Sequence, residues 1–210
     1  MATRMLPVFD ARPATIAARP QVSDELAEFT TDEVALPSFH VWTLGCQMNH
    51  SDSEEMAGAL LAAGCAQAPS LESAELIVIN SCAIREAAEQ KVIGRMGHLA
   101  RLRAANPALR VVLTGCSVRS DNTHVLHKRY PQVDLFLRPD EEPELTARLG
   151  LAGATSVGRM AAPAAQRNSA ISAWLPIIYG CDKTCTYCIV PFSRGPERSR
   201  PFDEVINEAR

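Results

Sequence analysis

The stretch LIVI, at residues 76–79, is an unbroken run of branched apolar residues. Such runs are typical of parallel strands, because helices cover both faces of the sheet that contains them. Strands are also expected at residues 39–44, 110–114 and 133–137, and helices at 51–63 (from a capping box between Ser51 and Glu54), 84–105 and 141–149. Strands that alternate with helices predict an α/β fold with a doubly wound parallel sheet.

Composition divides the chain into four parts. Residues 1–37 mix Pro, Ala, Thr and acidic residues without periodicity and are expected to form a disordered tail. The α/β domain then covers residues 38–150. Residues 151–172 are rich in Ala, Gly, Ser and Pro, which predicts a linker. Residues 173–210 open a second unit, which begins with a strand expected at 174–179.

Composition also narrows the class of protein. The chain has 210 residues, of which 47% are apolar, so it can bury a core. No stretch approaches the ~18 apolar residues of a membrane span, and the N-terminus lacks the apolar core of a secretory signal. A cytoplasmic protein without membrane contact is therefore expected. With a net charge of −3, the chain as a whole has no strong positive field that would attract nucleic acid. A local basic patch is still compatible with this net charge.

Seven cysteines are many for such a chain, and an odd number fits a disulfide framework poorly. Without a secretory signal, metal binding or redox chemistry is the better expectation. Cys181, Cys185 and Cys188, here called the loop trio, follow the spacing C-x3-C-x2-C. Thiolates are the usual ligands of four-iron clusters. Three ligands leave one iron open, and an open metal position is where a small molecule can react.

A second set, here called the edge trio, consists of Cys46, Cys82 and Cys116, each just beyond a predicted strand. They are 36 and 34 residues apart, and the strand ends of a parallel sheet meet along one ligand-binding edge. Helix N-termini at that edge favour thiolates. Zinc is the rival metal for either trio, although structural zinc usually takes four ligands. Cys65 follows a helix and is expected in the core.

Longer motifs carry a resemblance to a known family. The run GCDKTCTYC at 180–188 resembles the radical S-adenosylmethionine (SAM) signature and, with its continuation to Pro201, the methylthiotransferases. The runs GCQMN at 45–49 and NSCAIRE at 80–86 resemble the amino-terminal domain of that family. The residues after both cysteines are most similar to the branch that modifies N6-dimethylallyladenosine in tRNA. The resemblance covers about residues 39–210.

The resemblance implies two [4Fe-4S] clusters and SAM as cofactors. The loop trio would hold the radical-SAM cluster, and SAM would bind its open iron. The edge trio would hold an auxiliary cluster that carries or supplies the methylthio sulfur. Tyr187 is expected near the SAM adenine, with a plain core aromatic as the alternative. Arg194, Glu197 and Arg200 either line the active site or pin the loop by ion pairs.

The resemblance also implies a reaction and partners. An electron from the loop-trio cluster would cleave SAM to methionine and a 5′-deoxyadenosyl radical, which would abstract hydrogen from C2 of a prenylated adenosine beside the anticodon. A second SAM would donate the methyl group. The expected partners are tRNA and an electron donor such as flavodoxin or ferredoxin, and the protein is expected to be a monomer.

Length limits this expectation. Only 29 residues follow Cys181, about one β/α unit with a helix starting near Asp203, whereas a full barrel takes roughly 250 residues. The chain is therefore expected to be an N-terminal fragment with a truncated radical-SAM partial barrel, inactive alone. Two alternatives stay open. One is a methylthiotransferase for threonylcarbamoyladenosine in tRNA or for a ribosomal protein; the other is a non-catalytic iron–sulfur or zinc-binding module.

Overall fold

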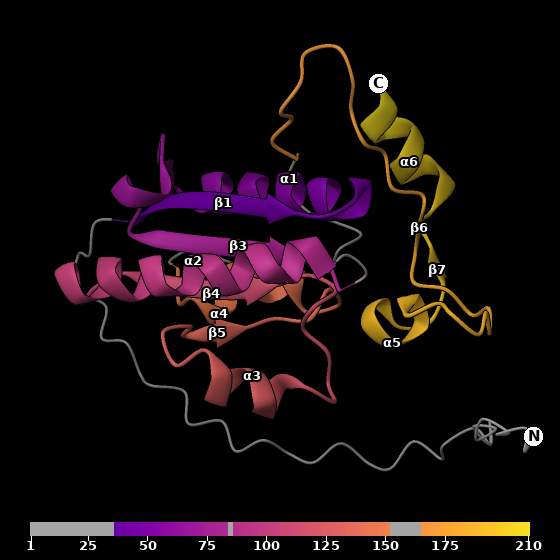
Figure 1. Ribbon diagram of the computed structural model, residues 1–210. Coiled ribbons are helices and arrows are strands. Elements are labelled where there is room, and N and C mark those ends of the chain that lie inside the picture. Colours follow the sequence, from indigo (N-terminus) through magenta and orange to yellow (C-terminus); the bar gives the residue numbers. More distant parts are fainter. Residues whose placement is uncertain (1–35, 84–85, 152–164) are drawn as a thin grey trace, which may run out of the picture. The chain divides into compact units, whose positions relative to one another are not determined.

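The protein was analysed as a computed structural model, which describes residues 36–83, 86–151 and 165–210. A five-stranded parallel sheet dominates residues 36–151 (Figure 1). Its strands, in the spatial order β2-β1-β3-β4-β5, are β1 (Ser38–Leu44), β2 (Ala66–Gln67), β3 (Leu76–Ser81), β4 (Arg110–Thr114) and β5 (Leu135–Phe136). The predicted α/β fold with a parallel sheet is confirmed.

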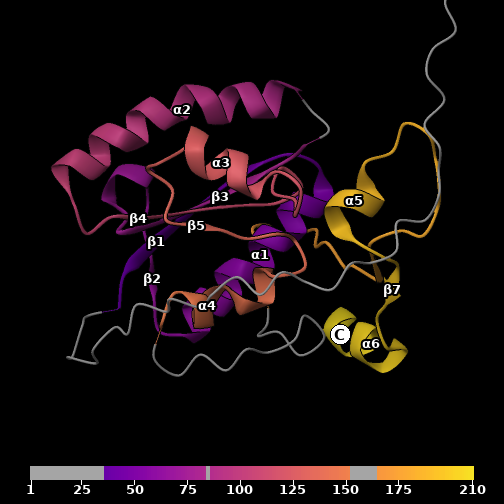
Figure 2. The ribbon, with the colours of Figure 1, turned by 90° about the horizontal axis from the view of Figure 1, so that it is seen from below.

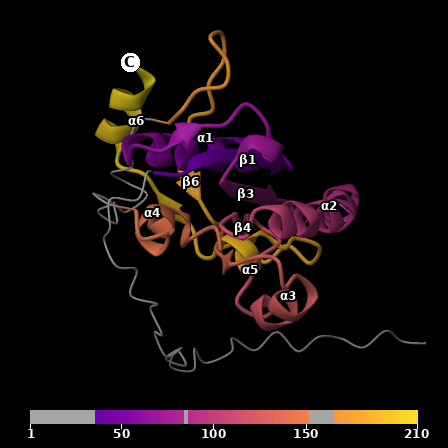
Figure 3. The same cartoon turned by 90° about the vertical axis from the view of Figure 1, so that its left-hand side faces the viewer.

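Helices cover both faces of this sheet. They are α1 (Gln47–Ala62), α2 (Glu86–Ala105), α3 (Thr123–Arg129) and α4 (Leu145–Arg148), with short 3-10 turns η1 (Leu71–Ser73) and η2 (Glu142–Glu144). Helices α2 and α3 lie on one face, and α1 and α4 on the other (Figures 2 and 3). The strand order reverses between β1 and β3, as in doubly wound folds that bind ligands beside that switch point.

Strand β3 explains why the sheet is the centre of the core. All six of its residues are buried, and it pairs with β1 and β4 along its length. Ile77 and Ile79 pack in the apolar cluster under α2 and α3, and Leu76 and Val78 pack under α1 and α4. Each such side chain contributes about 1.5–3 kcal/mol when fully buried, so the apolar run sets the position of this strand.

The predicted capping box at the start of the first helix is wrong. Helix α1 begins four residues earlier than expected, at Gln47, and Ser51 and Glu54 are buried inside it. Cys46 occupies the N-cap, and its backbone N–H donates to the Asn49 side-chain oxygen at 3.3 Å. The Asn49 side chain thus satisfies the backbone N–H of Cys46, and the helix is capped at Cys46 rather than at Ser51.

The C-terminal segment departs further from expectation. The strand expected at 174–179 is reduced to β6 (Ile178–Tyr179), which pairs antiparallel with β7 (Arg198–Ser199). Helices α5 (Val190–Arg194) and α6 (Phe202–Ala209) follow the cysteine loop, and α6 confirms the helix expected near Asp203. A radical-SAM barrel begins with parallel strands, so no barrel portion is evident among these described residues. Pro176, which has no N–H to donate, precedes the shortened strand.

Several expectations fall on residues that are not described. The structure describes only Leu36 and Pro37 of the expected tail and Leu151 and 165–172 of the expected linker. Ile84 and Arg85 of the NSCAIRE motif also lie outside the described residues. The three boundaries between the four predicted parts therefore stay a prediction. Among the described residues, no helix is both long and apolar enough to cross a membrane.

Candidate functional site

The structure brings the edge trio to one edge of the sheet. Cys82 directly follows β3, while Cys46 and Cys116 lie two residues beyond β1 and β4. The strands are aligned at this end, because Leu44 pairs with Ser81. The three cysteine loops therefore leave the same carboxyl edge, as the sequence predicted.

Backbone contacts join these loops. The Cys82 N–H donates to the Leu44 carbonyl at 2.9 Å, which ties the second loop to the first. A Cβ on Gly45 would lie 3.0 Å from the Cys82 Cβ, so the first loop closely approaches that cysteine. Gly115 has a φ of +89°, and a Cβ there would lie 2.5 Å from the Ser81 carbonyl oxygen. A larger residue at Gly115 would separate the second and third loops.

Two buried asparagines position the first loop. The Asn49 Nδ2 donates to the Asn80 Oδ1 at 2.7 Å, and the Asn80 Nδ2 donates to the Asn49 carbonyl at 2.8 Å and to the Ser53 Oγ at 3.0 Å. Both side chains are fully buried, where unmade bonds are costly. The pair fixes the first turn of α1, and with it Cys46, against β3. The sequence signal was a polar residue, Asn80, at the end of an apolar strand.

Arg194 connects the C-terminal segment to the edge trio. Its Nε donates to the Cys116 Sγ at 3.1 Å, and its guanidinium pairs with the Asp52 carboxylate at 2.6 Å. The Arg194 side chain is 6% exposed and that of Asp52 1%. Sequence reasoning left Arg194 between lining the active site and pinning the loop. The structure shows an ion pair that holds α5 against the edge trio.

Burial and the charge of Arg194 have opposite effects on the pKa of the Cys116 thiol. Burial raises the pKa of the Cys116 thiol, and the neighbouring Arg194 offsets part of that rise. Burial alone would lower the pKa of the Arg194 guanidinium, but Asp52 and Cys116 more than compensate, so the net shift of that pKa is upward. Arg194 is therefore a permanent cation beside a cysteine that would be anionic as a metal ligand.

A cavity of about 280 Å³ adjoins the edge trio between α2 and α3. Cys82, Ser81 and Ser117 contribute to its wall. The hydroxyls of Ser81 and Ser117 are buried and lack a hydrogen-bond partner among the described residues. The Cys82 thiol together with hydroxyl donors that lack a partner among the described residues suits an anionic iron–sulfur group, whose sulfurs accept hydrogen bonds.

The loop trio lies on a more exposed loop. Cys185 is exposed, and Cys181 and Cys188 are partly exposed. The Cys188 N–H donates to the Cys185 carbonyl, and the Cys181 N–H donates to the Gly195 carbonyl, both at 3.1 Å. These bonds shape the loop and tie its start to the end of α5.

Among the residues expected near the loop trio, Tyr187 is 91% exposed, so the alternative that it is a core aromatic is wrong. The Glu197 N–H donates to the Asp182 carboxylate at 2.9 Å. Arg200 donates to the Pro176 carbonyl at 2.9 Å and pairs with Glu208 at 2.6 Å. Arg200 thus pins this segment. The place of Tyr187 beside SAM stays a prediction.

Metal-ligand geometry is not preformed at either trio. Within residues 36–83, 86–151 and 165–210, no three His, Cys, Asp or Glu side chains already form a group that could hold a metal ion. The ligand roles of Cys46, Cys82 and Cys116, and of the loop trio, therefore stay predictions. Cys65 is 3% exposed beneath α1, which confirms its expected place in the core.

Comparisons with known proteins agree with the motifs. Residues 38–138 match the family described as "Uncharacterized protein family UPF0004". The tRNA-2-methylthio-N(6)-dimethylallyladenosine synthase of Roseiflexus sp. (strain RS-1) is 40% identical over 173 residues, which are 82% of this chain and 36% of that protein. The synthases of Bacillus subtilis (strain 168) and Thermodesulfovibrio yellowstonii are 39% and 37% identical, over 82% and 80% of this chain and 36% and 41% of their own.

The chain thus spans well under half the length of these curated relatives. The similarity nevertheless extends over about four-fifths of the chain itself, beyond the matched family region. The resemblance inferred from the cysteine motifs is confirmed: the chain is related to the N-terminal part of the tRNA methylthiotransferases, and its residues 38–138 match the UPF0004 family.

Proposed function

We propose that this chain is the N-terminal part of a tRNA methylthiotransferase, which adds a methylthio group to C2 of N6-dimethylallyladenosine beside the anticodon. The observation that carries the proposal is the meeting of the edge trio at one edge of the sheet, in a chain 37–40% identical to synthases named for that product. Residues 38–150 would form the auxiliary-cluster domain, and residues 173–210 would open the radical-SAM domain.

The proposed cofactors are two [4Fe-4S] clusters and SAM. Cys46, Cys82 and Cys116 would hold one cluster, and the adjoining cavity with the Ser81 and Ser117 hydroxyls supports this assignment. The loop trio would hold the second cluster, which leaves one iron open to SAM. When bound, these groups supply a radical from SAM and the sulfur that is inserted.

The protein's own part in this chemistry is to bring the two cysteine sets together. Arg194 follows the loop trio by six residues and contacts both Cys116 and Asp52. Its positive charge favours the anionic form of Cys116. The Asn49–Asn80 pair holds Cys46 in place from the other side. Arg194 and the asparagines are therefore positioning residues.

The proposed partners follow from the same assignment. The substrate is a tRNA with a prenylated adenosine beside the anticodon, and a small redox protein such as flavodoxin or ferredoxin supplies electrons. The similarity to tRNA-modifying synthases supports the tRNA partner, whereas the redox partner rests on the proposed radical chemistry.

Product analysis tests this function. The full-length protein that contains this chain, with both clusters loaded, SAM and reductant, should convert N6-dimethylallyladenosine in tRNA to its 2-methylthio form, measured by nucleoside mass spectrometry. The same protein should leave threonylcarbamoyladenosine unchanged. The 210-residue chain alone should give no product. Methylthiolation of threonylcarbamoyladenosine or of a ribosomal protein instead, or product from this chain alone, would contradict the proposal.

A further inference from the structure

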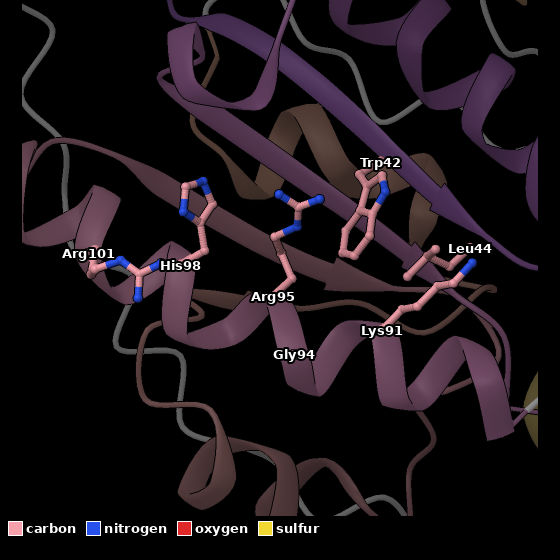
Figure 4. A pocket seen from close by; sticks show the side chains of 7 residues that line it. All are labelled: Trp42, Leu44, Lys91, Gly94, Arg95, His98 and Arg101. Atoms are coloured by element: carbon pink, nitrogen blue, oxygen red, sulfur yellow. The ribbon is translucent and has the colours of Figure 1, made fainter.

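A groove of about 620 Å³ lies between β1 and α2 and shares no lining residue with the cavity beside the edge trio. Four nitrogen-bearing side chains of α2 line it: Lys91, Arg95, His98 and Arg101. Their spacing of four, three and three residues places them on one side of the helix, over about 15 Å of its axis. Figure 4 shows Lys91 beside Leu44 and Arg95 facing Trp42 of β1. We call this feature the α2 groove.

The positive charge of the α2 groove is largely unpaired. Within the described part of the chain, neither Lys91 nor Arg95 nor Arg101 forms an ion pair with a carboxylate. Of the four side chains, only His98 has a carboxylate partner among the described residues, Glu72 at 3.2 Å. The chain as a whole has a net charge of −3, so these cations form a local field of opposite sign. Such a field attracts anions and favours a polyanionic ligand.

The floor of the groove is aromatic. Trp42 is partly buried, and the Arg95 guanidinium lies 5.1 Å from the centre of its ring. A guanidinium over an indole ring forms a cation–π contact, and an arginine side chain carries five N–H donors. RNA-binding proteins combine such planes with cations, because bases stack on them while phosphates meet the charges. This pairing favours RNA over an acidic protein surface.

Gly94 leaves open space beside α2 in the groove. It lies in the interior of α2 and lines the groove, and nothing lies within 4 Å of the Cβ it lacks. A glycine inside a helix is less stable than alanine, and here no neighbour within the described residues requires it. The open space at Gly94 would let a ligand backbone approach the helix closely.

The α2 groove ends at the candidate site. Leu44 lines it and is the last residue of β1, two residues before Cys46. The Leu44 carbonyl also accepts the Cys82 N–H at 2.9 Å. A strand of RNA in the groove would therefore pass next to the edge where sulfur insertion is proposed.

We propose that the α2 groove binds the phosphate backbone of the substrate tRNA next to the modified nucleotide. The identity of this RNA rests on the proposed function. The cations of α2 contact phosphates, and Trp42 with Arg95 offers a surface for a base. Because phosphate contacts position an RNA without reading its sequence, the groove fixes where the RNA lies and does not select the base.

Binding of the 210-residue chain to a fluorescent anticodon stem-loop RNA, followed by anisotropy, tests this proposal. Arg95→Gln and Arg101→Gln should each raise the Kd about fivefold and reduce the slope of log K against log salt by about 0.7–1. The matched control is Arg148→Gln, which removes the same charge from α4 on the opposite face of the sheet. It should change the Kd less than about twofold, as expected without a phosphate contact.

Two glycine variants separate charge from shape. Gly94→Ala and Gly97→Ala both remove a glycine from the same helix, and both should raise thermal stability. Gly97 does not line the groove. Gly94→Ala alone should weaken RNA binding, by at least about threefold, because its Cβ occupies the space of the ligand.

Three outcomes would overturn the proposal: no binding of the stem-loop by the wild-type chain, equal binding by all variants, or displacement of the RNA by polyglutamate as readily as by unlabelled RNA. The last would indicate docking of an acidic protein. None of these results bears on the iron content of the chain or on product formation by the full-length protein. Failure of the groove proposal is thus distinguishable from failure of the proposed function.

Discussion

Replacing Cys46, Cys82 and Cys116 together by alanine should lower the iron content of the anaerobically reconstituted chain from about eight atoms to about four. The reason is geometric, because these thiols are the only cysteines at the carboxyl edge of the sheet in the part of the chain that the structure describes. The loop trio would keep its own cluster. Iron and sulfide assays with the visible absorption spectrum measure the change.

Cys65 provides the matched control. It is as buried as Cys116, at 3% exposure each, but it packs beneath α1 and follows no strand of the sheet edge. Cys65→Ala should therefore retain about eight irons. Equal loss of iron in both variants would mean that the chain loses metal whenever a buried cysteine is removed, and the site assignment would then be wrong.

The second large effect is expected at Arg194. Arg194→Gln removes the cation from a pair that is 6% and 1% exposed and leaves the Asp52 carboxylate buried. Breaking a buried ion pair in this way costs about 3–5 kcal/mol, so the free energy of unfolding should fall by that amount. Urea unfolding followed by circular dichroism measures it.

Arg148→Gln is the control for this experiment. Its pair with Glu144 lies on the surface, with both side chains more than 40% exposed, so the loss should stay below about 1 kcal/mol. Amide exchange gives a second reading, since α5 should become less protected in Arg194→Gln if the pair holds it against the edge trio. Equal losses in the two variants would show that the contact of Arg194 with Asp52 and Cys116 does not stabilise the fold.

The sheet could be predicted because its signals are local. The run at residues 76–79 is apolar throughout, which happens where both faces of a strand are covered, and it became the fully buried β3. Cys46, Cys82 and Cys116 could be placed at one edge because parallel strands end together. Strand β2 was missed because two exposed residues carry no periodic signal.

Contacts between distant residues explain what the sequence did not show. Arg194 and Asp52 are 142 residues apart, and no local pattern pairs them. The start of α1 was misplaced because Ser51 and Glu54 imitate a cap, whereas Asn49 and the buried Asn80 fix the helix at Cys46. The α2 groove forms because α2 packs next to Trp42 of β1. The periodicity of apolar residues in the sequence does not define that packing. A local basic patch was compatible with the composition, but only the fold locates it.

The most direct test of the central claim, that the sheet edge holds an iron–sulfur cluster, isolates that edge. In a chain with Cys181, Cys185 and Cys188 replaced by alanine, the edge trio is the one remaining candidate cluster site. After anaerobic reconstitution this variant should contain about four irons with matching sulfide and visible absorbance. Absence of iron, or bound zinc without visible absorbance, would contradict the account.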